Sequence, residues 1–353
     1  MTHFTKTLKY FTLVVLLAGL AIACQQSAPV ASETQVSEQT TTVSESATQT
    51  EKLNISATIF PVYDIARQIV GDKGNVTLVM DPGESPHTYE TTPSDMIEVS
   101  EADLILAIGN ELDHWIENMV EDSSAEIVTV DANIALRPYE DEHDDHDDHD
   151  KHDDHDKHDD HDKHDDHDKH DDHEGHDDHE GHNHGEFDPH YWLSAQNGKI
   201  MAVNIANALS EVDPDNSDYY MTNVSNFQAS IDDIIPEIVA LATPVSTKPF
   251  IPLHDGWYYY CAEFDLNIVD NFFPGGQHQS TPQHTVELTE KVANLGVTAI
   301  FSEIGLDTSA IKGFAQDNDL TISELDPLGG SPQIQRYQDL LLQNMKWINE
   351  GLK

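Results

Sequence analysis

The sequence predicts an α/β protein of two lobes, each with a mostly parallel sheet, joined by a long rigid helix. In both halves of the chain, short apolar runs typical of strands alternate with segments that repeat at helical spacing. Between the halves, apolar residues recur every three or four positions over about residues 215–242. The parts on either side of this segment each have the size of a small domain.

Each lobe is expected to contain four strands and the helices between them. In the first lobe, residues 53–212, apolar runs predict strands over 53–59, 76–80, 103–108 and 126–130. Helical spacing in the same lobe predicts helices over 63–70 and 94–101. In the second lobe, residues 248–353, the same signals predict strands over 249–253, 267–269, 297–301 and 320–323. They also predict helices over 287–295 and 308–316.

The connection between the lobes, residues 213–247, is expected to be the long helix. Asp213 and Pro214 fit a helix cap and first turn. Pro236 lies inside the periodic pattern and predicts a kink or a break, because proline lacks the backbone N–H and clashes with the preceding turn. A helical rod would restrict motion between the lobes more than a loop would.

The first 52 residues indicate export. Residues 1–23 combine two early lysines with an apolar run too short for a secure membrane span, which is typical of a secretory signal. Cys24 follows Ala-Ile-Ala, which resembles a bacterial lipoprotein cleavage box. We therefore expect lipid on Cys24, with a soluble secreted protein cleaved nearby as the alternative. Residues 24–52 are rich in Ser, Thr, Gln and Glu and predict a flexible tether.

The chain has only two cysteines, Cys24 and Cys261. If Cys24 carries lipid, no internal disulfide can form, although the compartment would allow one. Cys261 is expected to be a small buried apolar residue.

The formal net charge is −49, and residues 140–186 contribute 24 acidic side chains against four lysines. Such acidity excludes nucleic acid as a partner and argues against direct adhesion to anionic lipid. It favours solubility and creates a field that attracts cations.

Fifteen histidines lie between His143 and His184, almost all three residues apart, with aspartate between them. No packed core can form here, because no apolar side chain is present to offset the entropy lost on ordering. Imidazole and carboxylate are both metal ligands. The histidine tract, residues 141–186, is therefore predicted to be a disordered loop that binds several divalent metal ions weakly. A solubilising acidic insert is the alternative.

Three histidines outside the tract, His87, His190 and His254, follow expected strands or lie in polar loops. Proline precedes the first two and fixes the backbone before the imidazole. In doubly wound sheets, ligands bind at the carboxyl ends of the strands. Any one of these histidines alone is more often a surface or hydrogen-bonded residue. Together, and with the tract beside His190, they favour a metal site.

Two carboxylates also follow expected strands of the second lobe. Asp326 is a candidate fourth ligand, and a turn-forming aspartate is the alternative. Three imidazoles and one carboxylate would suit tetrahedral zinc. Glu303 is expected to orient a ligand histidine or to contact the other lobe. His114, His278 and His284 are expected to be ordinary surface residues.

Five motifs occur in the order in which a known family has them: Pro86-His87 with Tyr89, Asp188-Pro-His190 with Trp192, His254-Asp255 with Tyr259, Ile300-Phe-x-Glu303 and Leu325-Asp-Pro-Leu328. From about residue 53 to the end, the chain resembles the metal-binding solute receptors of bacterial ABC importers for zinc and manganese. The resemblance implies two lobes joined by a long helix, with the metal held between them. It also implies His87, His190 and His254 as ligands, with Asp326 or water in the fourth position.

The third histidine separates zinc from manganese within this family. Manganese receptors usually have glutamate where this sequence has His254, and imidazole suits zinc while carboxylate and water suit manganese. Zinc members resemble this chain in carrying a His/Asp-rich loop between the first two ligand histidines. Two departures concern the pocket rim. Thr91 stands where the family commonly has proline, and Ile304-Gly305 replaces the usual Pro-Gln after Glu303.

The resemblance implies a receptor that captures Zn²⁺ as its transported ligand and delivers it to the membrane permease and ATPase of an ABC importer. The chain is then expected to be monomeric and anchored at Cys24, in the periplasm or at the cell surface. A manganese receptor and an extracytoplasmic metal buffer or adhesin are the alternatives. No enzyme is expected: a zinc hydrolase fits less well, because the sequence has no HExxH motif and only Glu303 could serve as a base.

Overall fold

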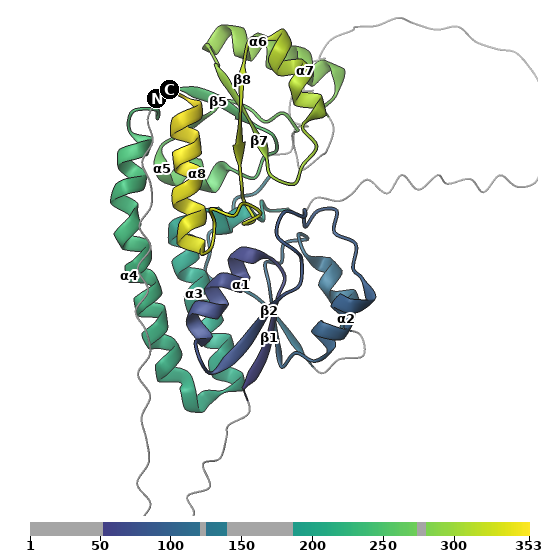
Figure 1. Cartoon of the computed structure of the whole chain (residues 1–353), viewed down its shortest axis with the longest axis vertical. Coiled ribbons are helices and arrows are strands. Elements are labelled where there is room, and N and C mark those ends of the chain that lie inside the picture. Colours follow the sequence, from purple (N-terminus) through teal and green to yellow (C-terminus); the bar gives the residue numbers. More distant parts are fainter. Residues whose placement is uncertain (1–51, 121–124, 140–185, 274–279) are drawn as a thin grey trace, which may run out of the picture. The chain divides into compact units, whose positions relative to one another are not determined.

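The computed structural model describes residues 52–120, 125–139, 186–273 and 280–353, and their strands form two parallel sheets (Figure 1). The predicted signal, all of the tether except Lys52 and all of the histidine tract except Glu186 lie outside the described residues. Among the described helices, none combines the length and the apolar character that a membrane crossing needs.

The first lobe is built on a sheet with the strand order β2-β1-β3-β4. Its strands are β1 (Leu53–Ala57), β2 (Gly74–Leu78), β3 (Leu104–Ala107) and β4 (Glu126–Thr129). Its helices are α1 (Phe60–Val70), α2 (Pro93–Ser100), the 3₁₀ helix η1 (His114–Met119) and α3 (Ala195–Val212). The chain crosses from β1 to β2 in one direction and from β2 to β3 in the other. Right-handed crossovers therefore put α1 and α2 on opposite faces of the sheet.

The second lobe repeats this plan with the strand order β6-β5-β7-β8, again all parallel. Its strands are β5 (Pro249–Pro252), β6 (Asn267–Ile268), β7 (Ala299–Glu303) and β8 (Thr321–Leu325). Its helices are α5 (Tyr258–Phe264), α6 (Pro282–Leu295), α7 (Ser309–Asp317) and α8 (Tyr337–Gly351). The predicted fold class is confirmed in both lobes.

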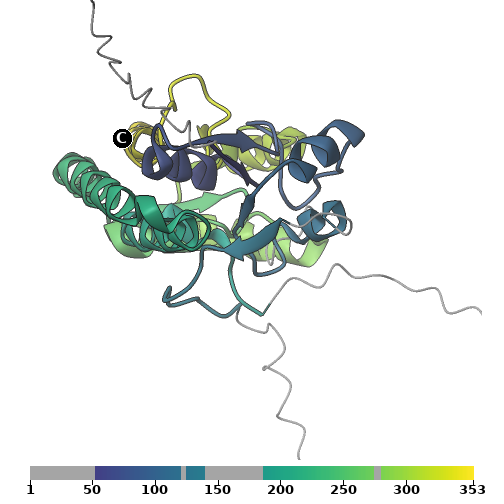
Figure 2. The same ribbon diagram turned by 90° about the horizontal axis from the view of Figure 1, so that it is seen from below.

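The long helix α4 runs over Ser217–Ala242, after the 3₁₀ turn η3 (Pro214–Asn216). It packs against α1 and α3 of the first lobe and against α5 and α8 of the second. Figure 2 shows α3 and α4 lying side by side. Of the kink or break predicted at Pro236, the break does not occur, because α4 continues through this residue to Ala242. Burial of Ile231 and Ile238 on either side holds the helix together despite the missing backbone hydrogen bond.

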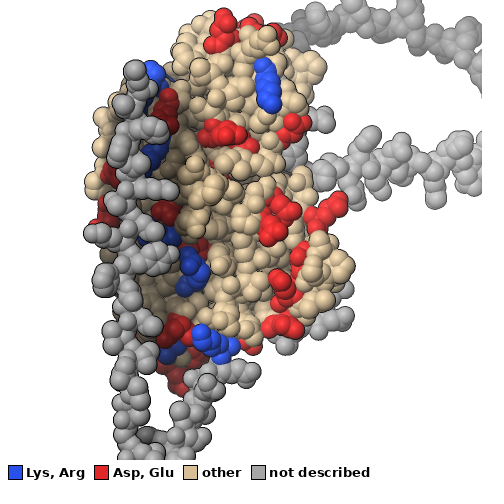
Figure 3. Space-filling model, in the orientation of Figure 1, with Lys and Arg blue, Asp and Glu red and all other residues tan. Residues whose placement is uncertain are grey.

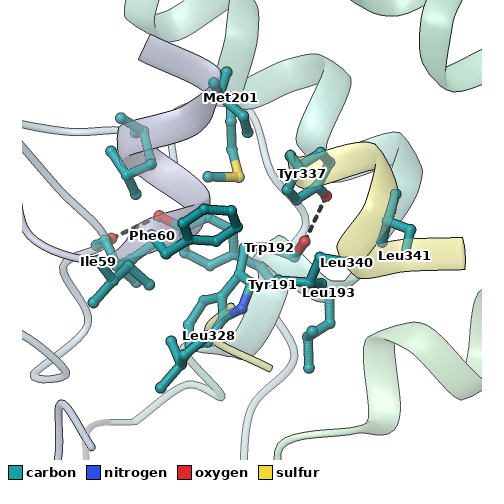
Figure 4. Packing of buried hydrophobic residues seen from close by; sticks show 14 of the residues in the cluster. Ile59, Phe60, Tyr191, Trp192, Leu193, Met201, Leu328, Tyr337, Leu340 and Leu341 are labelled. Atoms are coloured by element: carbon teal, nitrogen blue, oxygen red, sulfur yellow. Dashed lines mark hydrogen bonds between the residues drawn. The ribbon is translucent and has the colours of Figure 1, made fainter. Parts of the chain in front are cut away.

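A single hydrophobic cluster connects the lobes. It contains Phe60 of α1, Trp192 and Tyr337, with Leu328 after β8 packed among them (Figure 4). The Tyr337 hydroxyl donates a hydrogen bond to the Trp192 carbonyl at 2.5 Å, and the Tyr337 N–H donates to the buried Asp64 carboxylate at 2.7 Å. Buried contacts of this kind fix the two sheets relative to each other within this part of the chain. A second cluster, around Ile300, belongs to the second lobe alone.

Three helices, α3, α5 and α8, have no counterpart among the predicted segments. The buried faces of α3 and α8 carry asparagines, which interrupt the apolar periodicity. Asn204 of α3 donates to the Val130 carbonyl at 2.8 Å, and Asn344 of α8 donates to the Asp326 carbonyl at 2.8 Å. Only tertiary hydrogen bonding explains why these asparagine side chains are buried. Strands β2 and β7 are offset by two residues from their predicted ranges.

Candidate metal site

Three of the predicted ligands meet in the structure. His87, His190 and His254 each offer a ring nitrogen, and these nitrogens all lie within 4.8 Å of one another. His190 is central: its Nε2 lies 3.2 Å from Nε2 of His87 and 3.2 Å from Nε2 of His254. No other group of at least three His, Cys, Asp or Glu side chains with this spacing occurs among the described residues.

The three histidines come from different parts of the fold. His87 lies in the loop after β2, His190 begins the short 3₁₀ helix His190–Leu193, and His254 follows β5. The first two are contributed by the first lobe and the third by the second lobe. His190 is 2% exposed and His254 is 9% exposed, whereas His87 is half-buried. A ligand held here is therefore bound between the lobes and largely removed from solvent.

The spacing of the nitrogens fits one tetrahedral metal ion. Zinc–nitrogen bonds of about 2.0–2.1 Å at tetrahedral angles place two ligand nitrogens about 3.3 Å apart. The two Nε2–Nε2 distances of 3.2 Å match this value. Three neutral imidazoles suit zinc and copper better than the harder manganese ion.

A buried aspartate orients His190. Oδ1 of Asp188 lies 2.9 Å from His190 Nδ1 and accepts the His190 backbone N–H at 3.0 Å. Because the carboxylate accepts the Nδ1 proton, the lone pair of Nε2 faces the other two histidines. Such carboxylate–histidine pairs fix the ring orientation of metal ligands and strengthen them as donors.

Glu303, at the end of β7, plays the same part for His254. Its Oε1 lies 2.5 Å from His254 Nδ1 and also accepts the indole N–H of Trp257 at 2.9 Å. Burial by itself lowers the pKa of His254, but the charge of Glu303 and its hydrogen bond outweigh burial and raise this pKa to about 9. With this pKa, His254 is protonated at neutral pH in the metal-free protein, and a metal ion bound through this imidazole would have to displace the proton.

Zinc binding should depend on pH through this proton. Because the pKa of His254 is raised in the fold, the protonated imidazole stabilises the metal-free protein. This contribution is fully present below the ordinary histidine pKa near 6.5 and is lost as pH rises through about 9. Apparent zinc affinity should rise by about tenfold per pH unit over that window, since one proton competes with the metal. Calorimetry at pH 7.5 in buffers of different ionisation enthalpy should detect this proton. The variant Glu303→Gln should release fewer protons per zinc ion bound. Equal release from both proteins would contradict the role of Glu303 in raising the pKa of His254.

The loop that carries His87 is held by aromatic residues. The indole N–H of Trp115 donates to the Pro86 carbonyl at 3.2 Å, and the Trp115 ring packs against Tyr89 with centroids 4.5 Å apart. The Tyr89 hydroxyl donates to Asp95 at 2.7 Å, and Asp95 completes a capping box with Thr92 at the start of α2. The position of His87 is thereby tied to a helix of the first lobe.

Asp326 lies outside the group of three histidines. Its Oδ1 accepts the backbone N–H groups of Leu328 and Gly330, and its Oδ2 accepts that of Ser331 at 2.6 Å. The carboxylate therefore shapes the turn after β8, as in the alternative interpretation of the sequence. Of the three histidines expected at the surface, His114 and His284 also lie outside the group, and His278 is not among the described residues. His284 Nε2 lies 2.8 Å from the Asn271 carbonyl oxygen instead.

Several residues that support the site were not assigned a role from the sequence. Asp188, Trp115 and Trp257 act through the histidines or their loops. The acid two positions before His190 was a usable signal for Asp188, because short Asp-x-His spacing allows a local hydrogen bond. The partners of both tryptophans lie 29 and 46 positions away, so nothing local in the sequence reveals them.

The two ends of the histidine tract are paired beside the site. Pro138 and Phe187 form an antiparallel bridge, and the Tyr139 N–H donates to the Glu186 carbonyl at 3.1 Å. Next to this bridge, the Arg137 guanidinium packs over the Tyr258 ring, 3.7 Å from its centroid. The tract thus leaves and re-enters the fold at neighbouring positions, within a few residues of Asp188 and His190.

Acidic side chains are spread over both lobes on the face shown in Figure 3. With the net charge of −49, they give the molecule a field that draws cations toward it.

Cys261 is free and buried as predicted, and burial raises the pKa of its thiol. It is not part of the metal site.

The chain is similar to known proteins whose names refer to zinc uptake or manganese transport. The sequence is similar to the high-affinity zinc uptake system protein ZnuA of Brucella abortus (strain 2308), with 32% identity over 313 residues, covering 86% of this chain and 91% of the relative. It is also similar to the manganese ABC transporter substrate-binding lipoprotein PsaA of Streptococcus mitis, with 26% identity over 321 residues, covering 86% and 90%.

Among solved structures, a crystal structure of ZnuA matches the fold with a TM-score of 0.67 and 22% identity, covering 86% of this chain and 100% of that one. The model of a protein family described as "Zinc-uptake complex component A periplasmic" matches residues 55–351. Because that match spans nearly all of both lobes, this chain belongs to the ZnuA family of periplasmic zinc-uptake components.

Proposed function

We propose that this protein is an extracytoplasmic zinc receptor, which captures Zn²⁺ between its two lobes and delivers it to an ABC importer. The observation that carries the proposal is the group of three histidine nitrogens, all within 4.8 Å of one another and contributed by both lobes. His87, His190 and His254 are the proposed ligands. The engagement of both Asp326 oxygens by backbone N–H groups favours water in the fourth position.

Capture follows from the way the imidazoles are held. Asp188 and Glu303 occupy the Nδ1 sides of His190 and His254, so that only their Nε2 atoms face the ion. Because these rings are fixed before the ion arrives, binding costs little side-chain entropy. Loss of the proton from His254 accompanies capture. Protonation of the same nitrogen, or separation of His254 from the first lobe, would release the ion.

Zinc is expected to outcompete manganese, because the site presents three nitrogens and no carboxylate oxygen among its grouped ligands. Competition titrations at equal free metal concentration, with a chromophoric chelator reporting free zinc, provide the test. Copper is expected to bind at least as tightly in such a titration, since it leads the affinity order. Manganese binding in preference to zinc would refute the zinc assignment and support the manganese receptor, to which one relative's name points.

Two other functions are weaker. A free-standing metal buffer or adhesin would use the same site and tract without a permease. Zinc uptake that requires this protein in cells expressing the permease and ATPase would distinguish a receptor from a buffer or adhesin.

A zinc hydrolase would need a base facing the metal-bound water. Glu303 is the nearest candidate, but it is 2% exposed and bonded through Oε1 to His254 and Trp257. This engagement supports a protein that binds and does not catalyse.

The proposed setting is the periplasm or the cell surface. Lipid on Cys24 and the tether over residues 24–52 would keep the monomeric receptor near its permease. Mass spectrometry of the membrane fraction decides whether the mature chain begins with lipidated Cys24.

A further inference from the structure

Three glycines form a close backbone contact between the lobes at the rim of the metal pocket. Gly83 lies in the loop that leads to His87, Gly305 follows Glu303, and Gly330 lies in the turn shaped by Asp326. Gly83 and Gly305 both line the pocket, together with the three histidines. We refer to Gly83, Gly305 and Gly330 as the glycine contact.

The contact leaves no space for a side chain. A Cβ on Gly305 would lie 2.0 Å from the Gly83 carbonyl oxygen, and a Cβ on Gly330 would lie 2.9 Å from Gly83 Cα. Both obstacles are backbone atoms, which cannot rotate away as a flexible side chain could. Gly83 and Gly305 also have positive φ angles of 96° and 91°, which favour glycine. An added methyl group would therefore push the two loops apart.

The loops at this contact are close in sequence to two of the proposed ligands or their partners. The Gly83 loop carries His87 four residues later, in the first lobe. Gly305 comes two residues after Glu303, which holds the His254 ring. A shift between Gly83 and Gly305 thus moves His87 relative to His254 across the pocket. Tetrahedral coordination tolerates little of this movement, since zinc–ligand distances vary by only about 0.2 Å.

We propose that the glycine contact is the positioning element of the metal site: the absence of side chains at Gly305 and Gly330 lets the Gly83 loop approach closely enough for His87 to join His190 and His254 around one ion. This inference rests on the proposed function, because it assigns a role within the proposed metal site. Asp326 contributes to it indirectly, since its carboxylate holds the Gly330 N–H at 3.1 Å.

Four alanine variants of the full-length protein separate crowding from backbone strain. Gly305→Ala introduces both, whereas Gly330→Ala crowds Gly83 at a residue without positive φ. Gly296→Ala introduces strain alone, because its φ is 71° and nothing lies within 4 Å of the added Cβ. Gly313→Ala, in α7, introduces neither. All variants keep the histidine tract, so its contribution is the same in each.

The measurement is the rate at which protein loaded with one equivalent of zinc loses it to excess chelator. Gly305→Ala and Gly330→Ala should speed the slow phase by about 10- to 100-fold, the range seen when partners that orient metal ligands are removed. Gly296→Ala and Gly313→Ala should release zinc at the parent rate. The absorption of the cobalt-loaded protein should weaken only in the first two variants, as their tetrahedral geometry is lost. Melting of the metal-free proteins confirms that all four fold.

Two results would overturn the proposal. Release at the parent rate from both Gly305→Ala and Gly330→Ala would show that the contact does not position His87. Equally fast release from Gly296→Ala would show that strain, and not crowding, is responsible. Failure of the proposed function has a different signature: the parent protein would then lack a slow phase, or His254→Ala would leave that phase unchanged.

Discussion

Replacing His190 with alanine is expected to remove the tight zinc site and to weaken zinc binding by about tenfold or more, since one of three ligands is lost. Among the three histidines, His190 should show the largest effect, because its Nε2 lies 3.2 Å from Nε2 of both His87 and His254. His87→Ala and His254→Ala should also weaken binding. Competition with a high-affinity chromophoric chelator measures only the tightest ion and so excludes zinc on the tract.

His114→Ala is the matched control, because His114 is exposed and lies outside the group of ligands. Its zinc affinity should equal that of the parent protein. His190→Ala also leaves the buried Asp188 carboxylate without its imidazole, which should cost about 1–3 kcal/mol of stability. Thermal melting of the metal-free variant must therefore accompany the titration. Unchanged affinity in a folded His190→Ala protein would remove the three-histidine assignment.

Removing the histidine tract is expected to lower the zinc stoichiometry from several ions to one while leaving the tight site intact. The tract offers many transient ligands, so each ion it binds must overcome the entropy of ordering the chain. The interlobe histidines are already held by folded elements. The pairing of Tyr139 with Glu186 makes a clean deletion possible, because a short turn of about two to five residues can replace residues 140–185.

A tract of the same length with asparagine in place of histidine is the control for charge and chain length. It should lose the weak sites as the deletion does, and it should also lose the pH dependence of weak binding near about 6.5, where imidazole protonates. If the tract raises the local zinc concentration beside His190, uptake should fall only when zinc is scarce. Loss of the tight site from a folded deletion variant would mean that the tract supplies a primary ligand.

The sequence was informative about the fold because its signals are local. Apolar runs and helical spacing predicted the long helix and all eight strands found in the described parts of the chain, with offsets of two residues at β2 and β7. Helices α3 and α8 escaped prediction because their buried asparagines bond to distant carbonyls. Pro236 predicted a kink or a break, and α4 has no break there, since contacts with helices of both lobes hold the helix together.

For the site, the sequence by itself determined the candidate donors: three histidines with polar neighbours, their order along the chain, and a tract rich in imidazole and carboxylate groups. The tertiary structure decided which donors meet. It joined His87, His190 and His254 across two lobes, kept Asp326 on backbone N–H groups, and placed Gly83 against Gly305. The reason is physical. The type and local spacing of a ligand are encoded in neighbouring residues, whereas ligand geometry depends on contacts between residues far apart in the sequence, which only the packed core fixes.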